Sequence, residues 1–415
     1  MRRHQTLAVG MATCLLVLVG CTADSTAVQS TAPSPQTAAT AARSTSSEPG
    51  GQATASPSSM EVETPSSDDQ FGPPATETQL TASLVALHEW TFPQWYVFDI
   101  EWAPGGESFI IAKDDVKLLD AVTFEERWSL QPAAIVDTPT GAEFAADGGS
   151  IYLYDRGWGL QVRDPKAGDL IRNSRDDPHA FGGCLQGDAE DATWAADGKS
   201  LLIATADKRD PAVDFTEINV WDTASLRCQE EFAHTRGWNG VLDVGLDGRY
   251  LAFGTVLEIR HGETDGRDTE FGQVTVWDLD TPSHQQICAA GVGTFARFRP
   301  GTSILASPDP DQGGIAYWDV ETCEVVARIS GIPAPYDLAF SPDGDMLFAV
   351  LDRLWVMSSD SGEVLLEGEH TSLSEPSGFD SRQNSISISP DGRYMLTYSA
   401  YPADQSTLVL WEIKR

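Results

Sequence analysis

Residues 388–392 read Ile-Ser-Pro-Asp-Gly and lie between two short apolar stretches, and residues 410–412, near the end of the chain, read Leu-Trp-Glu. Residues 340–344 repeat the pattern as Phe-Ser-Pro-Asp-Gly, followed by Leu-Trp-Val at residues 354–356. Asp-Gly between two apolar runs favours a tight hairpin, because glycine accepts a positive φ without steric penalty. The pattern predicts short antiparallel strands joined by polar turns.

The same pattern occurs in five earlier copies, three of which end on Trp-Asp, at residues 221–222, 277–278 and 318–319. The seven turns lie 42 to 54 residues apart, at Gly105, Asp147, Asp197, Asp247, Gly301, Asp343 and Asp391. Repeats of this length with about four strands each are typical of propeller blades, because a lone blade cannot bury both of its faces. We therefore predict an all-β fold, a seven-bladed β-propeller of four-stranded antiparallel blades.

These units resemble WD40 repeats, and their turns are similar to those of TolB-like (PD40-related) propellers. The resemblance covers residues 82–415, which we take as the propeller domain. The Gly-His pair that usually precedes a WD40 blade is mostly missing, and only residues 233–235 and 369–371 place a histidine near that position. Stability in most blades is therefore expected to depend more on packing than on the usual WD40 hydrogen-bond network.

The seventh copy stops after its third strand, at Arg415. Residues 83–90, before the first blade, have strand character. We expect this N-terminal strand to complete the last blade, which would close the ring and remove an exposed sheet edge.

The N-terminus has the features of an export signal. Arg2 and Arg3 precede an apolar stretch, and residues 18–21 read Leu-Val-Gly-Cys, which resembles the lipobox of bacterial lipoproteins. The resemblance implies a signal peptide over 1–20, acylation (palmitate) on Cys21, and a lipid-anchored location at the cell membrane facing outside the cytoplasm. The alternative is an ordinary signal peptide with an incidental cysteine. Residues 21–81, rich in Ser, Thr, Ala and Pro, are predicted to form a disordered linker.

The chain carries 62 acidic and 27 basic residues, a formal net charge of -35. A polyanion of this kind repels nucleic acid and anionic lipid headgroups. Basic or neutral proteins, cations and uncharged glycans remain open as partners, and we expect a monomeric propeller attached to the membrane only through its lipid anchor.

The long loops of the predicted blades fall on one face, where binding residues usually lie. Aromatic residues in polar loop contexts on this face are candidates for contact with a protein or sugar partner. They are Trp95, Tyr96, Phe181, Trp238 and Tyr336. The alternative is that they plug the channel or pack beneath their own loops.

Acidic residues in the long loops are weak candidates for Ca²⁺ binding. They include Asp265, Asp268, Asp309 and Asp311. Solvated surface charge explains them better, so we predict neither a metal nor a cofactor. Four cysteines remain in the exported domain, and loop and strand placement favours Cys184–Cys228 and Cys288–Cys323 disulfides over free thiols.

No linear catalytic motif occurs in the sequence. We therefore expect a membrane-anchored propeller that binds a protein or peptide partner through its long-loop face and is not an enzyme. The alternative is a propeller enzyme, or a site for a small ligand or a Ca²⁺-dependent glycan, in the central channel.

Overall fold

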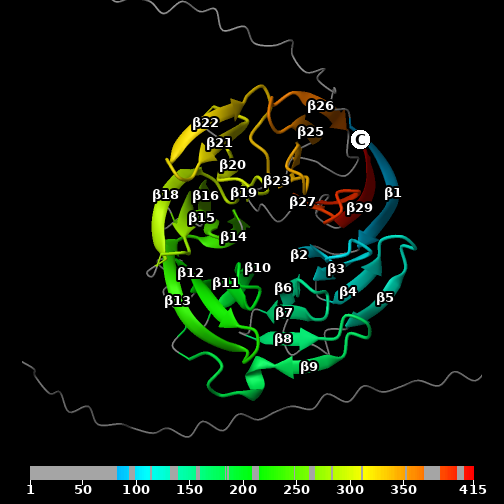
Figure 1. The fold of residues 1–415 in the computed structure, drawn as a ribbon, viewed down its shortest axis with the longest axis vertical. Helices are drawn as coiled ribbons and strands as arrows, with labels where there is room; N and C mark the ends of the chain where they lie inside the picture. The colour runs from blue at the N-terminus through cyan, green and yellow to red at the C-terminus, as the bar shows by residue number, and fades with distance from the viewer. Residues whose placement is uncertain are drawn as a thin grey trace, which may run out of the picture. The chain divides into compact units, whose positions relative to one another are not determined.

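The computed structural model describes residues 82–92, 99–112, 115–130, 139–155, 159–182, 184, 187–207, 215–246, 248–260, 267–281, 284–309, 312–350, 353–368, 384–399 and 406–415. Together they form seven sheets arranged in a ring, and Figure 1 looks along the ring axis. The prediction of a seven-bladed β-propeller of four-stranded antiparallel blades is confirmed. Residues 1–81, which include the predicted signal peptide, Cys21 and linker, lie outside the described residues.

Each blade runs outward from an inner strand at the ring centre. Blade 1 consists of β2 (Asp99–Trp102), β3 (Ser108–Ala112), β4 (Val116–Asp120) and β5 (Glu126–Leu130). Blade 2 consists of β6 (Pro139–Phe144), β7 (Ile151–Asp155), β8 (Leu160–Arg163) and β9 (Leu170–Asn173), followed by the short 3₁₀ helix η2 (Ser174–Asp176). Blade 3 consists of β10 (Asp188–Trp194), β11 (Ser200–Asp207), β12 (Phe215–Asp222) and β13 (Arg227–Arg236).

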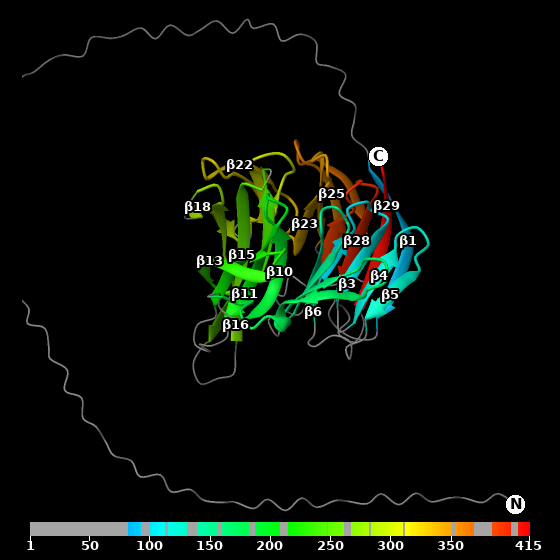
Figure 2. The ribbon, with the colours of Figure 1, turned by 60° about the horizontal axis from the view of Figure 1, so that its bottom comes forward.

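Blade 4 contains one additional strand. It consists of β14 (Trp238–Gly245), β15 (Tyr250–Arg260), β16 (Arg267–Phe271), β17 (Gln273–Asp278) and β18 (Gln285–Val292). Asp268, which the sequence placed in a long loop, lies instead in β16, and β16 pairs with the end of β15 from Val256↔Phe271 to Arg260↔Arg267. Figure 2 shows β16 at the lower edge of the ring.

Blades 5 and 6 return to four strands each. Blade 5 consists of β19 (Arg297–Phe298), β20 (Ile304–Pro308), β21 (Ile315–Asp319) and β22 (Glu324–Ile329). Blade 6 consists of β23 (Asp337–Phe340), β24 (Met346–Val350), β25 (Leu354–Ser358) and β26 (Val364–Gly368).

Blade 7 is shared between the two ends of the propeller. The C-terminal part supplies β27 (Asn384–Ile388), β28 (Tyr394–Ser399) and β29 (Ser406–Lys414), and β1 (Ser83–Phe92) pairs antiparallel with β29. The predicted closure by an N-terminal strand is confirmed, and the C-terminus lies beside β1 in Figure 1. The closed ring leaves no unpaired edge at β29.

The Ser-Pro-Asp-Gly turns are held by their own side chains. Ser389 Oγ donates to Asp391 Oδ1 at 2.7 Å and accepts the N–H of Tyr394 at 2.9 Å. Gly392 has a φ of +67°, which favours glycine at this position. The turn in blade 6 repeats these contacts through Ser341, so in these two blades the motif fixes where the inner strand ends and the second strand begins.

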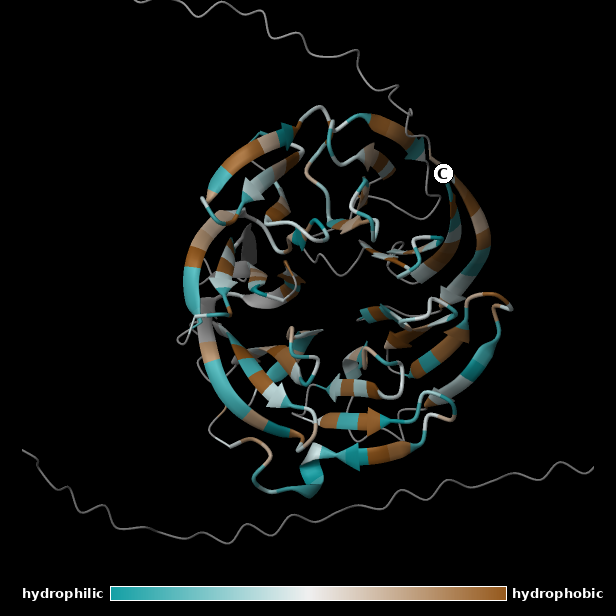
Figure 3. Cartoon of the chain, in the orientation of Figure 1, coloured by the Kyte–Doolittle hydropathy of each residue, from teal (hydrophilic) through white to brown (hydrophobic). Residues whose placement is uncertain are grey.

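The hydrophobic core lies between the faces of successive blades. Ile110 and Leu118 of blade 1, for example, pack with Phe144 and Leu153 of blade 2. Figure 3 shows hydrophilic and hydrophobic residues interspersed along the outer strand β13, where Cys228 is buried between the exposed Arg227 and Gln229. This alternation places one set of side chains on the core and the other in solvent.

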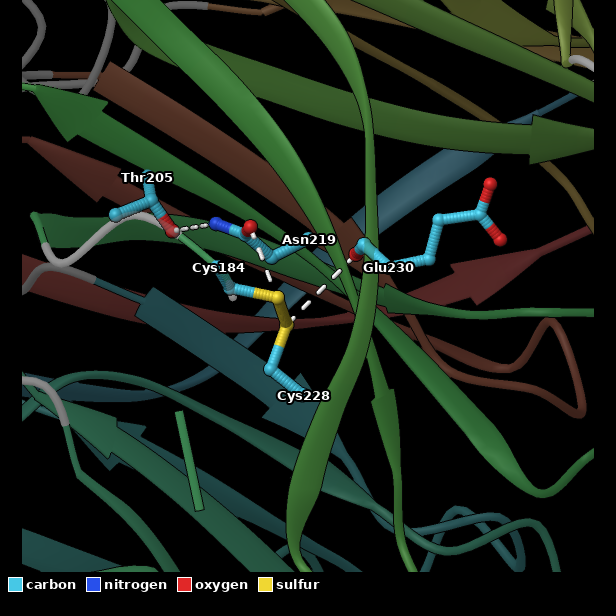
Figure 4. The surroundings of a disulfide bond; sticks show 5 residues. All are labelled: Cys184, Thr205, Asn219, Cys228 and Glu230. Carbon is cyan, nitrogen blue, oxygen red and sulfur yellow. Dashed lines mark hydrogen bonds between the residues drawn. A yellow bond between two sulfur atoms is a disulfide. The ribbon is translucent and has the colours of Figure 1, made fainter. Parts of the chain in front are cut away.

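Two disulfides connect segments at the outside of the ring, with the pairing that the sequence favoured. Cys184, in the connection between blades 2 and 3, is bonded to Cys228 of β13, and Cys288 of β18 is bonded to Cys323 in the next blade. In Figure 4, Cys228 Sγ lies 4.0 Å from Asn219 Oδ1, and Asn219 Nδ2 donates to Thr205 Oγ1 at 3.0 Å.

Candidate ligand site in the central channel

The inner strands of all seven blades surround one cavity of about 440 Å³. This volume lies within the range of small-molecule sites, roughly 300–1,000 Å³. The seven strands that converge on the ring centre in Figure 1 are β2, β6, β10, β14, β19, β23 and β27.

The turn hydrogen bonds establish which inner-strand residues are equivalent. In each blade a backbone N–H in the first turn donates to a carbonyl three residues earlier, at Ala103, Ala145, Ala195, Gly245, Arg299, Ser341 or Ser389. Because strand side chains alternate between faces, the residues two and four positions before each of these carbonyls face the same way.

The positions four residues back form what we call the first ring: Asp99, Gly141, Asp191, Val241, Phe295, Asp337 and Ser385. The positions two residues back form the second ring: Glu101, Glu143, Thr193, Asp243, Arg297, Ala339 and Ser387. All of these residues except Gly141 line the cavity. The first ring is nearer the end of the channel where the connections between blades enter.

The aspartates of the rings also join neighbouring blades. Asp99 Oδ2 accepts the N–H of Ala142 at 2.9 Å, and Asp191 Oδ2 accepts the N–H of Leu242 at 2.7 Å. Asp243 Oδ2 accepts the N–H of Phe298 at 2.5 Å, and Asp337 Oδ2 accepts the N–H of Ile386 at 3.1 Å. Each of these carboxylates is therefore held in a fixed orientation between two blades.

Arg297 is the only cationic residue among the described residues that line the cavity. Its guanidinium group donates to Asp337 Oδ1 at 3.3 Å and to the carbonyl oxygen of Leu338 at 3.2 Å. Burial opposes its charge, but the neighbouring carboxylates Asp337 and Asp243 outweigh that effect and raise its pKa. Arg297 is thus held as a cation on the wall formed by blades 4 to 6.

The wall formed by blades 1 to 3 has acidic residues and no cation among its described lining residues. Its carboxylates include Asp99, Glu101, Glu143 and Asp191. Burial raises the pKa of Asp191 to about 7, and the charge of Asp99 adds to this shift. On the opposite wall, burial raises the pKa of Asp243 to about 6 against the opposing charge of Arg297.

Glu101 and Glu143 differ from the four aspartates because no described residue stabilises their charge. Neither side chain forms a hydrogen bond or an ion pair within the described part of the chain. Burial raises the pKa of each well above its usual range, and the neighbouring carboxylates raise it further. Both residues are half-buried at the channel wall, and a proton or a bound cation would stabilise their carboxylates.

The carboxylates of this lining can therefore attract a cation or take up a proton. The described residues contain no group of three or more His, Cys, Asp or Glu side chains arranged to hold a metal ion.

The aromatic candidates from the sequence fall at different places. Phe181 is half-buried and packs edge-on against Trp221, with ring centroids 5.5 Å apart. Tyr336 is half-buried directly before Asp337, and its N–H donates to Val350 O at 2.8 Å. Trp95 and Tyr96 lie outside the described residues.

Trp238 was predicted to lie in a loop, but the structure places it in a strand. It is the first residue of β14, and a register shift between Trp238 and Val241 lets that strand begin earlier than the apolar pattern indicated. Trp238 and Tyr336 thus stand at, or directly before, the beginning of inner strands, at the mouth of the channel.

The weak metal candidates do not gather into a site within the described part of the chain. Asp309 pairs with Arg328 at 3.0 Å, and Asp268 lies opposite Ile259 in the β15–β16 pair. Asp265 and Asp311 lie outside the described residues.

The channel carboxylates and Arg297 were missed from the sequence. A signal was present, because charged residues recur at fixed offsets before the turns, in strands whose neighbours are apolar. Using that signal required knowing that the residues two and four positions before each turn carbonyl line the central cavity.

The fold and the cavity define the class of this protein as a seven-bladed β-propeller with an acidic central channel. No protein-family model matches the chain, and a search of curated proteins finds no match either. No helix in the described ranges is long and apolar enough to cross a membrane.

Proposed function

We propose that this chain is a binding protein whose central channel holds an organic cation. The observation that carries the proposal is the pair Glu101 and Glu143, which face the cavity without any stabilising partner in the described chain. A cationic ligand would supply that partner, and the rigid blades would hold the carboxylates ready for it. We propose binding rather than catalysis because the carboxylates that line the channel are sufficient to hold a cation.

We further propose that the propeller is carried outside the cytoplasm on a lipid anchor at Cys21, in keeping with its resemblance to WD40-like and lipoprotein sequences. The two disulfides support this location, because disulfides persist in oxidising compartments. Incorporation of radiolabelled palmitate into the wild-type protein but not into a Cys21→Ser variant would support the anchor. Equal labelling of both proteins would contradict it.

Ligand binding is tested by calorimetric titration of the full-length protein with n-butylamine and 1,4-diaminobutane at pH 8. Salt at 0.15 M reduces unspecific attraction to the acidic surface, because the Debye length is then about 8 Å. A Glu101→Gln/Glu143→Gln variant removes the two unpartnered carboxylates. A Glu125→Gln/Glu363→Gln variant makes the same charge change at two exposed positions.

We expect saturable binding to one site, weakened at least tenfold in the channel variant and unchanged in the surface variant. Recovery of the amine unaltered from the complex distinguishes binding from turnover. Absence of saturable binding, or equal affinities for all three proteins, would contradict the proposal.

A protein or peptide partner is the second candidate. It is favoured by the position of Trp238 and Tyr336, which begin or directly precede inner strands at the mouth of the channel. Affinity capture from membrane extracts compares the wild-type propeller with a Trp95→Ala/Trp238→Ala/Tyr336→Ala variant of unchanged fold. A protein enriched only by the wild type would support this candidate, and equal enrichment would contradict it.

A further inference from the structure

The acidic wall of the channel has two levels of negative charge. Asp99 and Asp191 belong to the first ring, and Glu101 and Glu143 belong to the second. Asp99 and Glu101 are two residues apart on β2, so their side chains leave the same face of the strand. Two residues advance a strand by about 6.6 Å, which sets the spacing between the levels.

The two levels are held at this spacing by the blades themselves. Ala142 lies between Gly141 and Glu143 on β6, and its N–H donates to Asp99 Oδ2 at 2.9 Å. The bond fixes β6 relative to β2, so Glu143 stays level with Glu101. Asp191 is fixed in the same way by its bond to Leu242 of blade 4.

The opposite wall offers no equivalent pair. Arg297 stands in the second ring with Asp337 and Asp243 around it, so part of the negative charge there is already neutralised. On blades 1 to 3 the described lining residues thus carry carboxylates at both levels and no cation of their own, and Arg297 across the channel is the one cation that acts on Asp99 and Asp191.

Resting on the cation-binding function proposed above, we propose that the ligand is a linear diamine with two positive charges. One ammonium group would contact Asp99 and Asp191, and the other would contact Glu101 and Glu143. In a staggered, extended chain of four or five carbons, the nitrogens of an α,ω-diamine are separated by roughly 6–7.5 Å, which matches the spacing between the levels.

The test is a series of α,ω-diaminoalkanes from two to eight carbons, titrated into the full-length protein at pH 8 and 0.15 M salt. n-Butylamine and n-pentylamine serve as single-charge controls of matched length. We expect the tightest binding at four or five carbons, at least tenfold tighter than the matched monoamine.

Two variants test the two levels separately. Asp99→Asn/Asp191→Asn keeps an oxygen that can accept the interblade N–H, and Glu101→Gln/Glu143→Gln removes the second level. Each variant is expected to bind 1,4-diaminobutane at least tenfold more weakly than the wild type. Each should also lose the preference for diamines of four or five carbons. Asp99 and Asp191 form hydrogen bonds between blades, so the aspartate variant could fail to fold. Glu101 and Glu143 form no such bonds with any described residue, so the Glu101→Gln/Glu143→Gln variant still tests the proposal in that case.

The outcomes separate this inference from the function on which it rests. If monoamines and diamines of every length bind equally well, or if affinity rises steadily with chain length, the diamine proposal is wrong. The proposed cation-binding function is then unaffected. If no amine binds at a saturable site, both are overturned.

Discussion

Gly141 and Tyr154 are cross-strand partners in blade 2, and a Cβ atom on Gly141 would lie 2.0 Å from the Tyr154 hydroxyl oxygen. The buried Tyr154 side chain occupies the space that a first-ring side chain would take, and its O–H donates to Asp99 Oδ2 at 3.3 Å. Blade 2 thus contacts the first-ring residue Asp99 through a side chain of its second strand.

This relationship predicts that Gly141→Ala destabilises the propeller. The added methyl group would displace a fully buried ring that is also hydrogen-bonded, at a cost of about 1–3 kcal/mol. Urea unfolding measures the change in the free energy of unfolding. Gly368→Ala is the control, because its nearest contact would be an ordinary 3.9 Å. Equal stability of the two variants would show that Tyr154 moves aside without penalty.

Ring closure predicts that removal of β1 destabilises all seven blades. In β1, Trp90 packs with Phe109 of blade 1, at 5.6 Å between ring centroids, and β1 covers the edge of β29. A chain starting at residue 93 is expected to lose cooperative thermal unfolding and to aggregate. A chain starting at residue 82 serves as the control and should unfold as the full-length protein does. Cooperative unfolding of the shorter chain would argue against closure as a source of stability.

The channel carboxylates predict that stability falls as the pH rises from about 4.5 to 8. Burial raises the pKa of Asp191 to about 7 and of Asp243 to about 6, whereas an unfolded Asp has a pKa of about 3.9. The folded state therefore binds more protons, and the stability that protonation contributes below the unfolded pKa is lost as the pH rises through the folded pKa.

Asp120 and Asp343 have the opposite effect at lower pH. Hydrogen bonds from Thr123 and Arg127 outweigh burial and lower the pKa of Asp120 to about 2, and Arg415 acts similarly on Asp343. Their contribution is present above the unfolded pKa and is lost as the pH falls toward 2. Urea unfolding at pH 3, 5 and 8 should give the highest free energy of unfolding at pH 5.

The Glu101→Gln/Glu143→Gln variant provides a direct check on the origin of this pH dependence. It should be more stable than the wild type at pH 8, because two uncompensated charges are removed, and the fall between pH 5 and 8 should become shallower. A wild-type stability that rises steadily from pH 5 to 8 would contradict the assignment.

The disulfides predict a separate loss of stability on reduction. Cys184–Cys228 and Cys288–Cys323 span 44 and 35 residues, and loops of this length contribute about 2–4 kcal/mol each. Dithiothreitol should lower the melting temperature of the wild type, measured by circular dichroism. It should leave a Cys184→Ser/Cys228→Ser/Cys288→Ser/Cys323→Ser variant unchanged. An effect of equal size on both proteins would point to a cause other than these bonds.

Much of the fold follows from the sequence because it is encoded locally. Ser389, Asp391 and Gly392 form their turn through contacts within a few residues, so each turn could be recognised without its neighbours. The regular spacing of the turns then predicts the number of blades, and the missing last strand predicts closure by residues 83–90. The preferred cysteine pairing followed from the same blade assignment.

The candidate site could not be found in this way. Asp99, Glu143 and Asp191 lie on three different blades, more than 40 residues apart, and none belongs to a local motif. Their charges interact only because the closed ring brings β2, β6 and β10 around one cavity, where burial and mutual repulsion raise their pKa values. The tertiary structure likewise decided that Phe181 packs on Trp221 and that Trp238 begins a strand. The sequence by itself determined the blades, because turns form through short-range contacts, and only the closed ring determined which side chains face one another across the channel.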